Sequence, residues 1–158
     1  MHVPKGYYVA ANEPDFIWAR NEQATTSQGF MIYTYPSEGA KSLTVEQLAD
    51  ARKRFAKRIP GPTEGSYMTN SPVFPPTEVS AFRLDGRLWV EMRGFWDVEN
   101  DYMGGPFVSY TTINDATNEV FTIDCYVHSP KYGKRNFLRP LEHLVYLISF
   151  PKSVEQAK

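Results

Sequence analysis

The sequence has little cysteine and histidine, no excess of either charge and no long apolar run. Its one cysteine, Cys125, excludes an internal disulfide and a cysteine-rich zinc site. The 17 Lys and Arg residues are balanced by 18 Asp and Glu residues, so no overall positive field attracts nucleic acid, and we expect no nucleic-acid partner. No apolar run approaches the roughly 18 residues of a transmembrane helix, and residues 1–15 lack a signal-peptide pattern. We therefore expect the chain alone to be soluble.

Candidate catalytic residues are few. Asp124 and His128 lie four positions apart on one predicted strand. At about 3.3 Å per residue they are separated by about 13 Å, so they cannot contact each other directly. A hydrolase site would need a hydroxyl from another strand, and Ser109 is the convenient candidate. This alternative stays open but names no specific reaction.

Acidic side chains alternate at Asp97, Glu99 and Asp101. They could form an acid–base pair or, with Glu64, hold a hard cation, but calcium requires more oxygen ligands at closer spacing. A solvated turn explains them more simply. Because the segment after Gly104 and Gly105 is a predicted strand and not a helix, these glycines do not form a phosphate loop. We expect no metal and no cofactor.

The 158 residues fit one α+β domain, residues 1–158. Alternating apolar residues and turn signals predict strands separated by short loops, with Asp85-Gly86 as a hairpin turn and residues 27–29 as a turn before the third strand. The proline-rich segment 60–76 contains Val73 and Phe74, which favour a packed loop. The predicted strands are 6–10, 15–20, 30–35, 66–69, 78–84, 87–98, 106–113 and 119–128.

Two segments have helical periodicity. The first begins at Thr44, where Thr44-x-x-Gln47 has capping-box form, and ends before Pro60, with Arg52 among the positions on its apolar side. Basic residues in its final turns complement the helix dipole. The second covers residues 137–150. These elements predict one antiparallel sheet, made of N-terminal strands and a four-strand meander, with two amphipathic helices on one face. This arrangement is similar to the sandwich architecture of PsbP and Mog1.

The stretch 93–110 combines aromatic residues, both charges and two adjacent glycines where a strand should turn. Such mixtures are enriched at recognition surfaces, which favours a binding site. Residues 131–136 add cations that could meet an anion or the 97–101 carboxylates. The candidate binding residues are Trp18, Arg93, Trp96, Asp101, Met103, Gly104, Gly105, Phe107, Lys134 and Arg135.

Six sequence motifs follow one another along the chain: GYYVAANEPDFIWAR (6–20), IPGPTEGSYM (59–68), RGFW (93–96), DYMGGPFVS (101–109), YVHSPKYGKRNFLRPLE (126–142) and YLISFP (146–151). Together they resemble one family, domain of unknown function family 4837, whose members look like bacterial cell-envelope lipoproteins. The resemblance covers nearly the whole chain and implies an envelope location. It also implies that the chain is the C-terminal portion of a longer exported protein, attached to the membrane only through a lipid anchor outside this chain.

The leading hypothesis is a non-enzymatic binding or interaction module for an unknown protein or a small anionic ligand. The rival hypotheses are a hydrolase that uses Asp124 and His128 or the 97–101 carboxylates, and a domain that packs against a missing N-terminal region. Three structural expectations follow. On the last strand, Phe121, Ile123 and Val127 should face the helices while Asp124 points away. Gly104 or Gly105 should have positive φ. Segment 93–107 should share one surface with Lys134 and Arg135.

Overall fold

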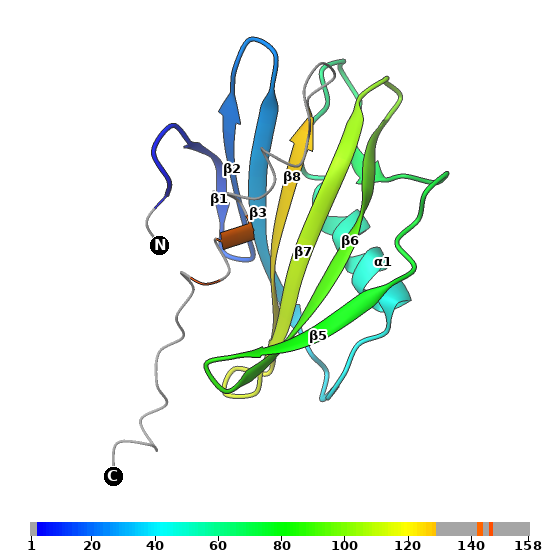
Figure 1. Cartoon of the computed structure of the whole chain (residues 1–158). Coiled ribbons are helices and arrows are strands. Elements are labelled where there is room, and N and C mark those ends of the chain that lie inside the picture. The colour runs from blue at the N-terminus through cyan, green and yellow to red at the C-terminus, as the bar shows by residue number, and fades with distance from the viewer. Residues whose placement is uncertain (1–2, 129–141, 144–145, 147–158) are drawn as a thin grey trace.

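The computed structural model describes residues 3–128, 142, 143 and 146, which contain one antiparallel sheet and the helix α1. The eight strands follow the order β1-β2-β3-β8-β7-β6-β4, and β5 also pairs with β6 (Figure 1). The predicted sheet and its β5–β8 meander are confirmed. The strands are β1 (Tyr8–Glu13), β2 (Phe16–Glu22), β3 (Ser27–Pro36), β4 (Tyr67–Asn70), β5 (Val79–Leu84), β6 (Arg87–Glu99), β7 (Gly104–Asn114) and β8 (Glu119–His128).

The helix α1 (Val45–Ala56) begins as predicted. The backbone N–H of Gln47 donates to Thr44 Oγ1 at 3.2 Å, and the Thr44 N–H donates to Gln47 Oε1 at 2.9 Å, which completes the capping box. The described part of the chain thus contains one helical element and not two. The predicted second helix, residues 137–150, lies outside the described residues except for positions 142, 143 and 146.

The hairpin between β5 and β6 is also confirmed. Asp85 and Gly86 have φ values of 51° and 75°, as a two-residue hairpin turn requires. The loop before it differs from expectation, because Val73 is 72% exposed and Phe74 is 63% exposed. Proline and glycine content shows where this loop lies but does not show that it is packed.

Both faces of the sheet are buried, and this reverses one prediction. The first core lies under α1 and contains Leu48 and Phe55 of the helix. The second core, on the opposite face, contains Ile123, Cys125 and Val127, with Phe121 packed against it. The predicted alternation along β8 is therefore correct, but these apolar residues point away from α1.

Asp124 lies under α1 instead, where it binds Arg52. Arg52 Nε and Nη2 donate to the two Asp124 carboxylate oxygens at 2.8 and 3.1 Å, and neither side chain is exposed. Arg52 Nη1 also donates to Asn70 Oδ1 at 2.9 Å, and its guanidinium carbon lies 3.7 Å from the Phe107 ring centroid. Burial raises the Asp124 pKa, and the positive charge of Arg52 opposes that rise. The prediction that Asp124 points outward is wrong because Arg52 is the polar residue of the apolar helix face.

The short helix leaves part of the sheet to be covered by other segments. The 12 residues of α1 span about 18 Å, whereas the 13 residues of β6 span about 43 Å. Figure 1 shows α1 on one side of the sheet, crossing behind strands that extend well past it. The loop after α1 and β4 continues the cover, since the Met68 N–H donates to the Ile59 carbonyl at 2.9 Å. A pocket lies where this cover meets the sheet.

Candidate binding pocket

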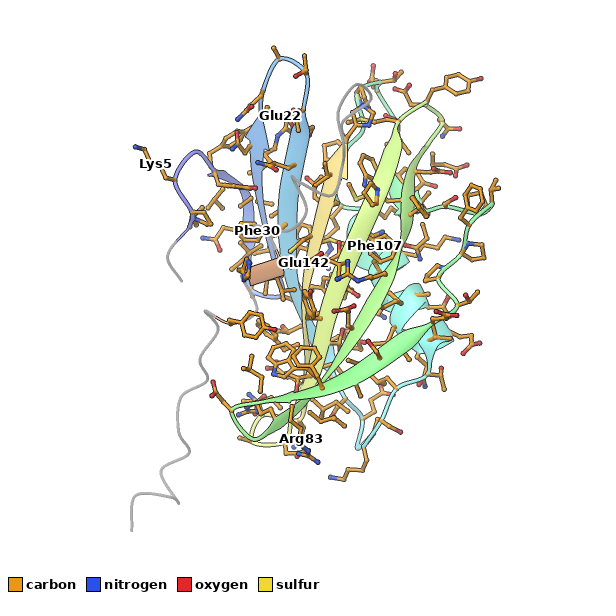
Figure 2. The ribbon with its side chains drawn as sticks, in the orientation of Figure 1. Lys5, Glu22, Phe30, Arg83, Phe107 and Glu142 are labelled. Carbon is orange, nitrogen blue, oxygen red and sulfur yellow. The ribbon has the colours of Figure 1, made fainter. Side chains whose placement is uncertain are left out.

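The pocket has a volume of about 250 Å³ and lies between one end of the sheet and the loop that follows α1. Strands β2, β6 and β8 provide the sheet wall, and residues 59–62 provide much of the opposite wall. Figure 2 shows Glu22, a lining residue, at the opposite end of the sheet from Arg83. The aromatic, charged and sulfur-containing side chains of the lining include Trp18, Arg20, Glu22, Trp96, Met103 and Tyr126.

Two tryptophans and a tyrosine form the inner wall of this pocket. Trp18 Nε1 donates to Tyr126 Oη at 2.7 Å, and the Trp96 and Tyr126 rings meet edge to face with centroids 5.6 Å apart. Trp96 Nε1 donates to the Val127 carbonyl at 3.3 Å. All three rings are buried, so their polar atoms are fixed by hydrogen bonds and their apolar surfaces shape the pocket.

A glycine makes the Trp18–Tyr126 contact possible. Gly29 lies on β3, between β2 and β8. A Cβ atom at this position would lie 2.6 Å from Tyr126 Cζ and 2.8 Å from the Ala19 carbonyl oxygen. The Tyr126 ring therefore crosses β3 above Gly29 to reach Trp18. Residues 27–29, predicted as a turn, instead begin β3.

The polar wall consists of Arg20, Glu22 and Ser27. Arg20 Nη2 lies 3.0 Å from Glu22 Oε1, and Ser27 Oγ donates to the same oxygen at 2.8 Å. The Arg20 guanidinium carbon lies 5.2 Å from the Trp18 ring centroid. Arg20 Nε has no hydrogen-bond partner among the described residues, although it is buried. Since the Arg20 and Glu22 side chains are 30% and 39% exposed, this wall is also the solvent side of the pocket.

Gly104 and Gly105 support the pocket by close backbone approach. Neither has positive φ, so the prediction of a left-handed turn there is wrong. A Cβ at Gly104 would lie 2.6 Å from the Trp96 carbonyl oxygen, and a Cβ at Gly105 would collide with the Val127 carbonyl oxygen. His128 Nδ1 lies 2.7 Å from the Gly104 carbonyl oxygen. Glycine is therefore needed at both positions because a side chain would not fit there, and not because the backbone has a positive φ.

The structure brings together some of the predicted site residues and separates others. Trp18, Trp96 and Met103 line the pocket, with Gly104 and Gly105 beside it. Phe107 lies deeper, under Arg52.

Asp101 and Arg93 are outside the pocket. The Asp101 carboxylate accepts from Thr63 Oγ1 at 2.6 Å, and this bond lowers the Asp101 pKa. Arg93 alternates with Trp96 on β6 and faces the second core, where it bonds Glu91 at 2.7 Å and Glu142 at 2.9 Å. The predicted single surface is thus divided between two faces of the sheet. Lys134 and Arg135 lie outside the described residues, so their part in that surface stays a prediction.

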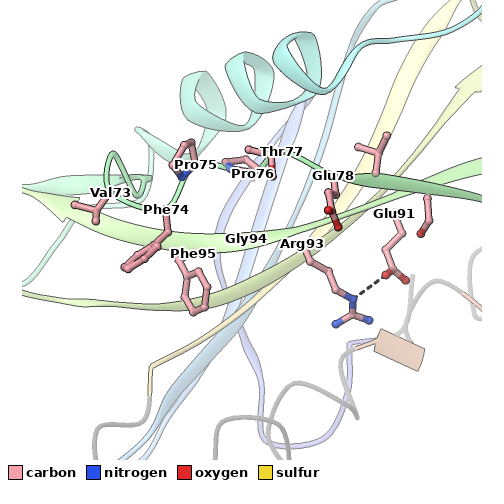
Figure 3. A pocket seen from close by; sticks show the side chains of 12 residues that line it. Val73, Phe74, Pro75, Pro76, Thr77, Glu78, Glu91, Arg93, Gly94 and Phe95 are labelled. Atoms are coloured by element: carbon pink, nitrogen blue, oxygen red, sulfur yellow. Dashed lines mark hydrogen bonds and ion pairs between the residues drawn. The ribbon is translucent and has the colours of Figure 1, made fainter.

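Arg93 belongs to a separate open groove of about 500 Å³ along β5 and β6. Figure 3 shows Phe74 and Phe95 beside each other in this groove, with Arg93 directed toward Glu91. The Phe74 and Phe95 ring centroids are 5.8 Å apart, and Phe95 is 48% exposed. The groove is an apolar surface with a charged end.

Asp124 and His128, the first residue set of the rival hydrolase hypothesis, do not form a site together. The Asp124 carboxylate is occupied by Arg52, and the His128 ring bonds the Gly104 carbonyl. Ser109 is opposite Asp124 in the β7–β8 ladder and is buried. Within residues 3–128, 142, 143 and 146, no group of three His, Cys, Asp or Glu side chains is placed to hold a metal ion.

The family profile described as Domain of unknown function (DUF4837) matches residues 1–146. The chain belongs to this family. No protein with curated annotation matches the DUF4837 chain. Among solved structures, it is similar to cyanobacterial PsbP (CyanoP) from Synechocystis sp. PCC 6803, with 17% identity and a TM-score of 0.41, over 78% of this chain and 71% of that one. Among the described residues of the DUF4837 chain, no helix combines the length and apolar character needed to cross a membrane.

Sequence reasoning missed Arg20, Glu22 and Tyr126 of the DUF4837 chain as site residues. Trp18 and Arg20 are two positions apart on the predicted strand 15–20, and Glu22 repeats the same spacing just beyond its predicted end, so all three share one face of β2. Tyr126 could not be found in this way, because its role depends on Gly29 of another strand.

Proposed function

We propose that the chain is a non-enzymatic binding module of the cell envelope, and that its site is the pocket between Trp18, Trp96 and Met103. The observation that carries this proposal is a hollow of about 250 Å³ with aromatic and sulfur-containing walls and one polar side. Ligand pockets commonly combine apolar walls with a few placed polar groups. The envelope location and the lipid anchor rest on the family resemblance.

The pocket suits binding better than chemistry. Its tyrosine is held by Trp18, and burial raises the Tyr126 pKa, so the phenol is a hydrogen-bonding group and not a base at neutral pH. Its carboxylate, Glu22, is paired with Arg20 and Ser27. A ligand with an apolar body would bury that body against the aromatic rings, and its polar group would meet the polar atoms on the solvent side of the pocket.

The indole N–H signals in NMR spectra test this proposal. Trp18 and Trp96 line the pocket, whereas Trp89 belongs to the second core and serves as an internal control. In titrations with small apolar acids, alcohols and amides, we expect a binder to shift the signals of Trp18 and Trp96 but not that of Trp89. Equal shifts of all three signals, or no shift with any compound, would contradict the proposal.

A pocket-filling variant provides a second test. Met103→Trp places a larger side chain on the pocket lining and is expected to abolish these shifts. Tyr102→Trp is the matched control, because Tyr102 is adjacent in sequence and fully exposed. Undiminished ligand binding by Met103→Trp would place the site elsewhere.

A second candidate function is a contact surface for another protein, favoured by the exposed Phe74–Phe95 pair. Two exposed aromatic rings in contact are the kind of apolar patch that marks interaction surfaces. A photo-crosslinking amino acid at position 95, in cells that produce the natural protein, should give a crosslinked protein product. The same amino acid at position 83, on exposed Arg83 of β5, is the control. Equal products at both positions would reject this candidate.

A further inference from the structure

The hydrogen-bonding groups of the pocket define a class of ligand. We infer that the pocket binds a small carboxylic acid with an apolar body, its carboxylate held by the Arg20 guanidinium and the Tyr126 hydroxyl. This inference rests on the proposed binding function and adds the chemistry of the ligand.

On the inner side of the pocket, the Tyr126 hydroxyl is the donor that has no acceptor among the described residues. Trp18 Nε1, Trp96 Nε1 and Ser27 Oγ already donate to Tyr126, Val127 and Glu22 respectively. The Tyr126 oxygen accepts from Trp18, and its own O–H, which has no acceptor within the described part of the chain, can donate to a ligand. A ligand group that meets Tyr126 in the pocket should therefore be a hydrogen-bond acceptor.

Arg20 adds a charge to this requirement. Its guanidinium has five N–H donors, while the structure pairs Nη2 with Glu22 and leaves Nε without a partner among the described residues. A carboxylate matches the planar arrangement of these donors and can be bound by two of them. Glu22 is partly exposed, so water can hydrate its carboxylate when the guanidinium turns toward a ligand.

The remaining walls select the body of the ligand. Ile59, Met68, Val98 and Met103 present aliphatic and thioether surface beside the two indole rings. The volume of about 250 Å³ is slightly below the roughly 300–1,000 Å³ of pockets for drug-sized ligands. A short alkyl or a single-ring acid fits these limits better than a long lipid.

Pairs of acids and amides of equal shape test the inference directly. The probes are hexanoate with hexanamide and 3-phenylpropionate with 3-phenylpropionamide, titrated into the protein and followed by the indole signals. We expect each acid to bind at least about tenfold more tightly than its amide, because a charged hydrogen bond is stronger than a neutral one. Acid and amide binding equally well at the pocket would overturn the carboxylate inference while leaving the binding function intact. No binding of any probe would overturn both.

The Arg20→Gln variant assigns the preference to one side chain. It should reduce the acid-to-amide affinity ratio to about one, because the acid then loses its charged partner. Arg83→Gln, at the opposite end of the sheet, is the control and should keep the ratio of the wild-type protein (Figure 2). An acid preference that survives Arg20→Gln, or equal weakening of acid and amide binding, would show that Arg20 does not bind the carboxylate.

Discussion

The buried pair of Arg52 and Asp124 gives the most decisive stability prediction. Both side chains have no exposed surface, and two hydrogen bonds of 2.8 and 3.1 Å join them. Arg52→Met retains an unbranched chain over Phe107 but leaves the Asp124 carboxylate buried without its cation. Breaking a buried pair in this way costs about 3–5 kcal/mol, a large part of the roughly 5–15 kcal/mol that stabilises a typical domain.

Urea denaturation followed by tryptophan fluorescence measures this loss. With a dependence of about 1–3 kcal/mol per molar urea, a loss near 4 kcal/mol lowers the midpoint by about 1.3–4 M. Lys53→Met is the matched control, since Lys53 is the exposed neighbour on the same helix, and it should change the free energy of unfolding by less than about 0.5 kcal/mol. A loss below about 1 kcal/mol in Arg52→Met would refute the reasoning.

The double variant Arg52→Met with Asp124→Leu separates the charge effect from packing. Replacing a whole buried ion pair by apolar residues is often neutral or stabilising, so the double variant should recover at least half of the loss.

The single Arg52→Met variant should also gain stability as pH falls from 7 to 5. Burial raises the Asp124 pKa, and without Arg52 the folded state binds a proton at a pH where the unfolded chain, with a carboxyl pKa of about 3.9, does not.

Three further predictions concern other buried groups. Gly105→Ala should lower the urea midpoint more than Gly65→Ala, because its Cβ collides with a β8 carbonyl oxygen, whereas a Cβ at Gly65 meets open space and costs only the strain of its positive φ of +81°. Burial raises the pKa values of Tyr33 and Tyr126, so the unfolded chain ionises first and the free energy of unfolding should fall as pH rises above about 10; an equal midpoint at pH 8 and 11 would contradict this. Cys125, fully buried with a raised pKa, should react with a thiol reagent only at the rate of unfolding, and fast labelling of the native protein would contradict its core position.

The fold was largely predictable because its signals are local. The capping box at Thr44, the Asp85-Gly86 turn and the alternation along β8 each depend on residues a few positions apart. Their agreement identifies the elements and the β5–β8 meander. Which β8 side chains lie under α1 was not predictable in this way. Both faces of the sheet are buried, and alternation alone does not show which of them α1 covers.

The candidate site was only partly predictable because its contacts join distant positions. Trp18 and Tyr126 are 108 residues apart in sequence, and their hydrogen bond passes over Gly29 on an intervening strand. Segment 93–110, with its unusual composition, contains Trp96 and Met103, which line the pocket. Arg93 of the same segment lies apart from them, because residues an odd number of positions apart on a strand face opposite sides of the sheet.

The positions of the two arginines explain why one stabilises the fold and the other is a candidate ligand contact. Arg52 is completely buried, its three guanidinium nitrogens donate to Asp124 and Asn70, and its guanidinium lies over the Phe107 ring. Arg20 is partly exposed, bonds Glu22 through Nη2, and lies beside a hollow with aromatic walls. Removing Arg52 should therefore reduce stability, whereas removing Arg20 should change ligand selectivity with little effect on unfolding. A large stability loss in Arg20→Gln would assign that side chain to the fold and remove the basis for carboxylate recognition.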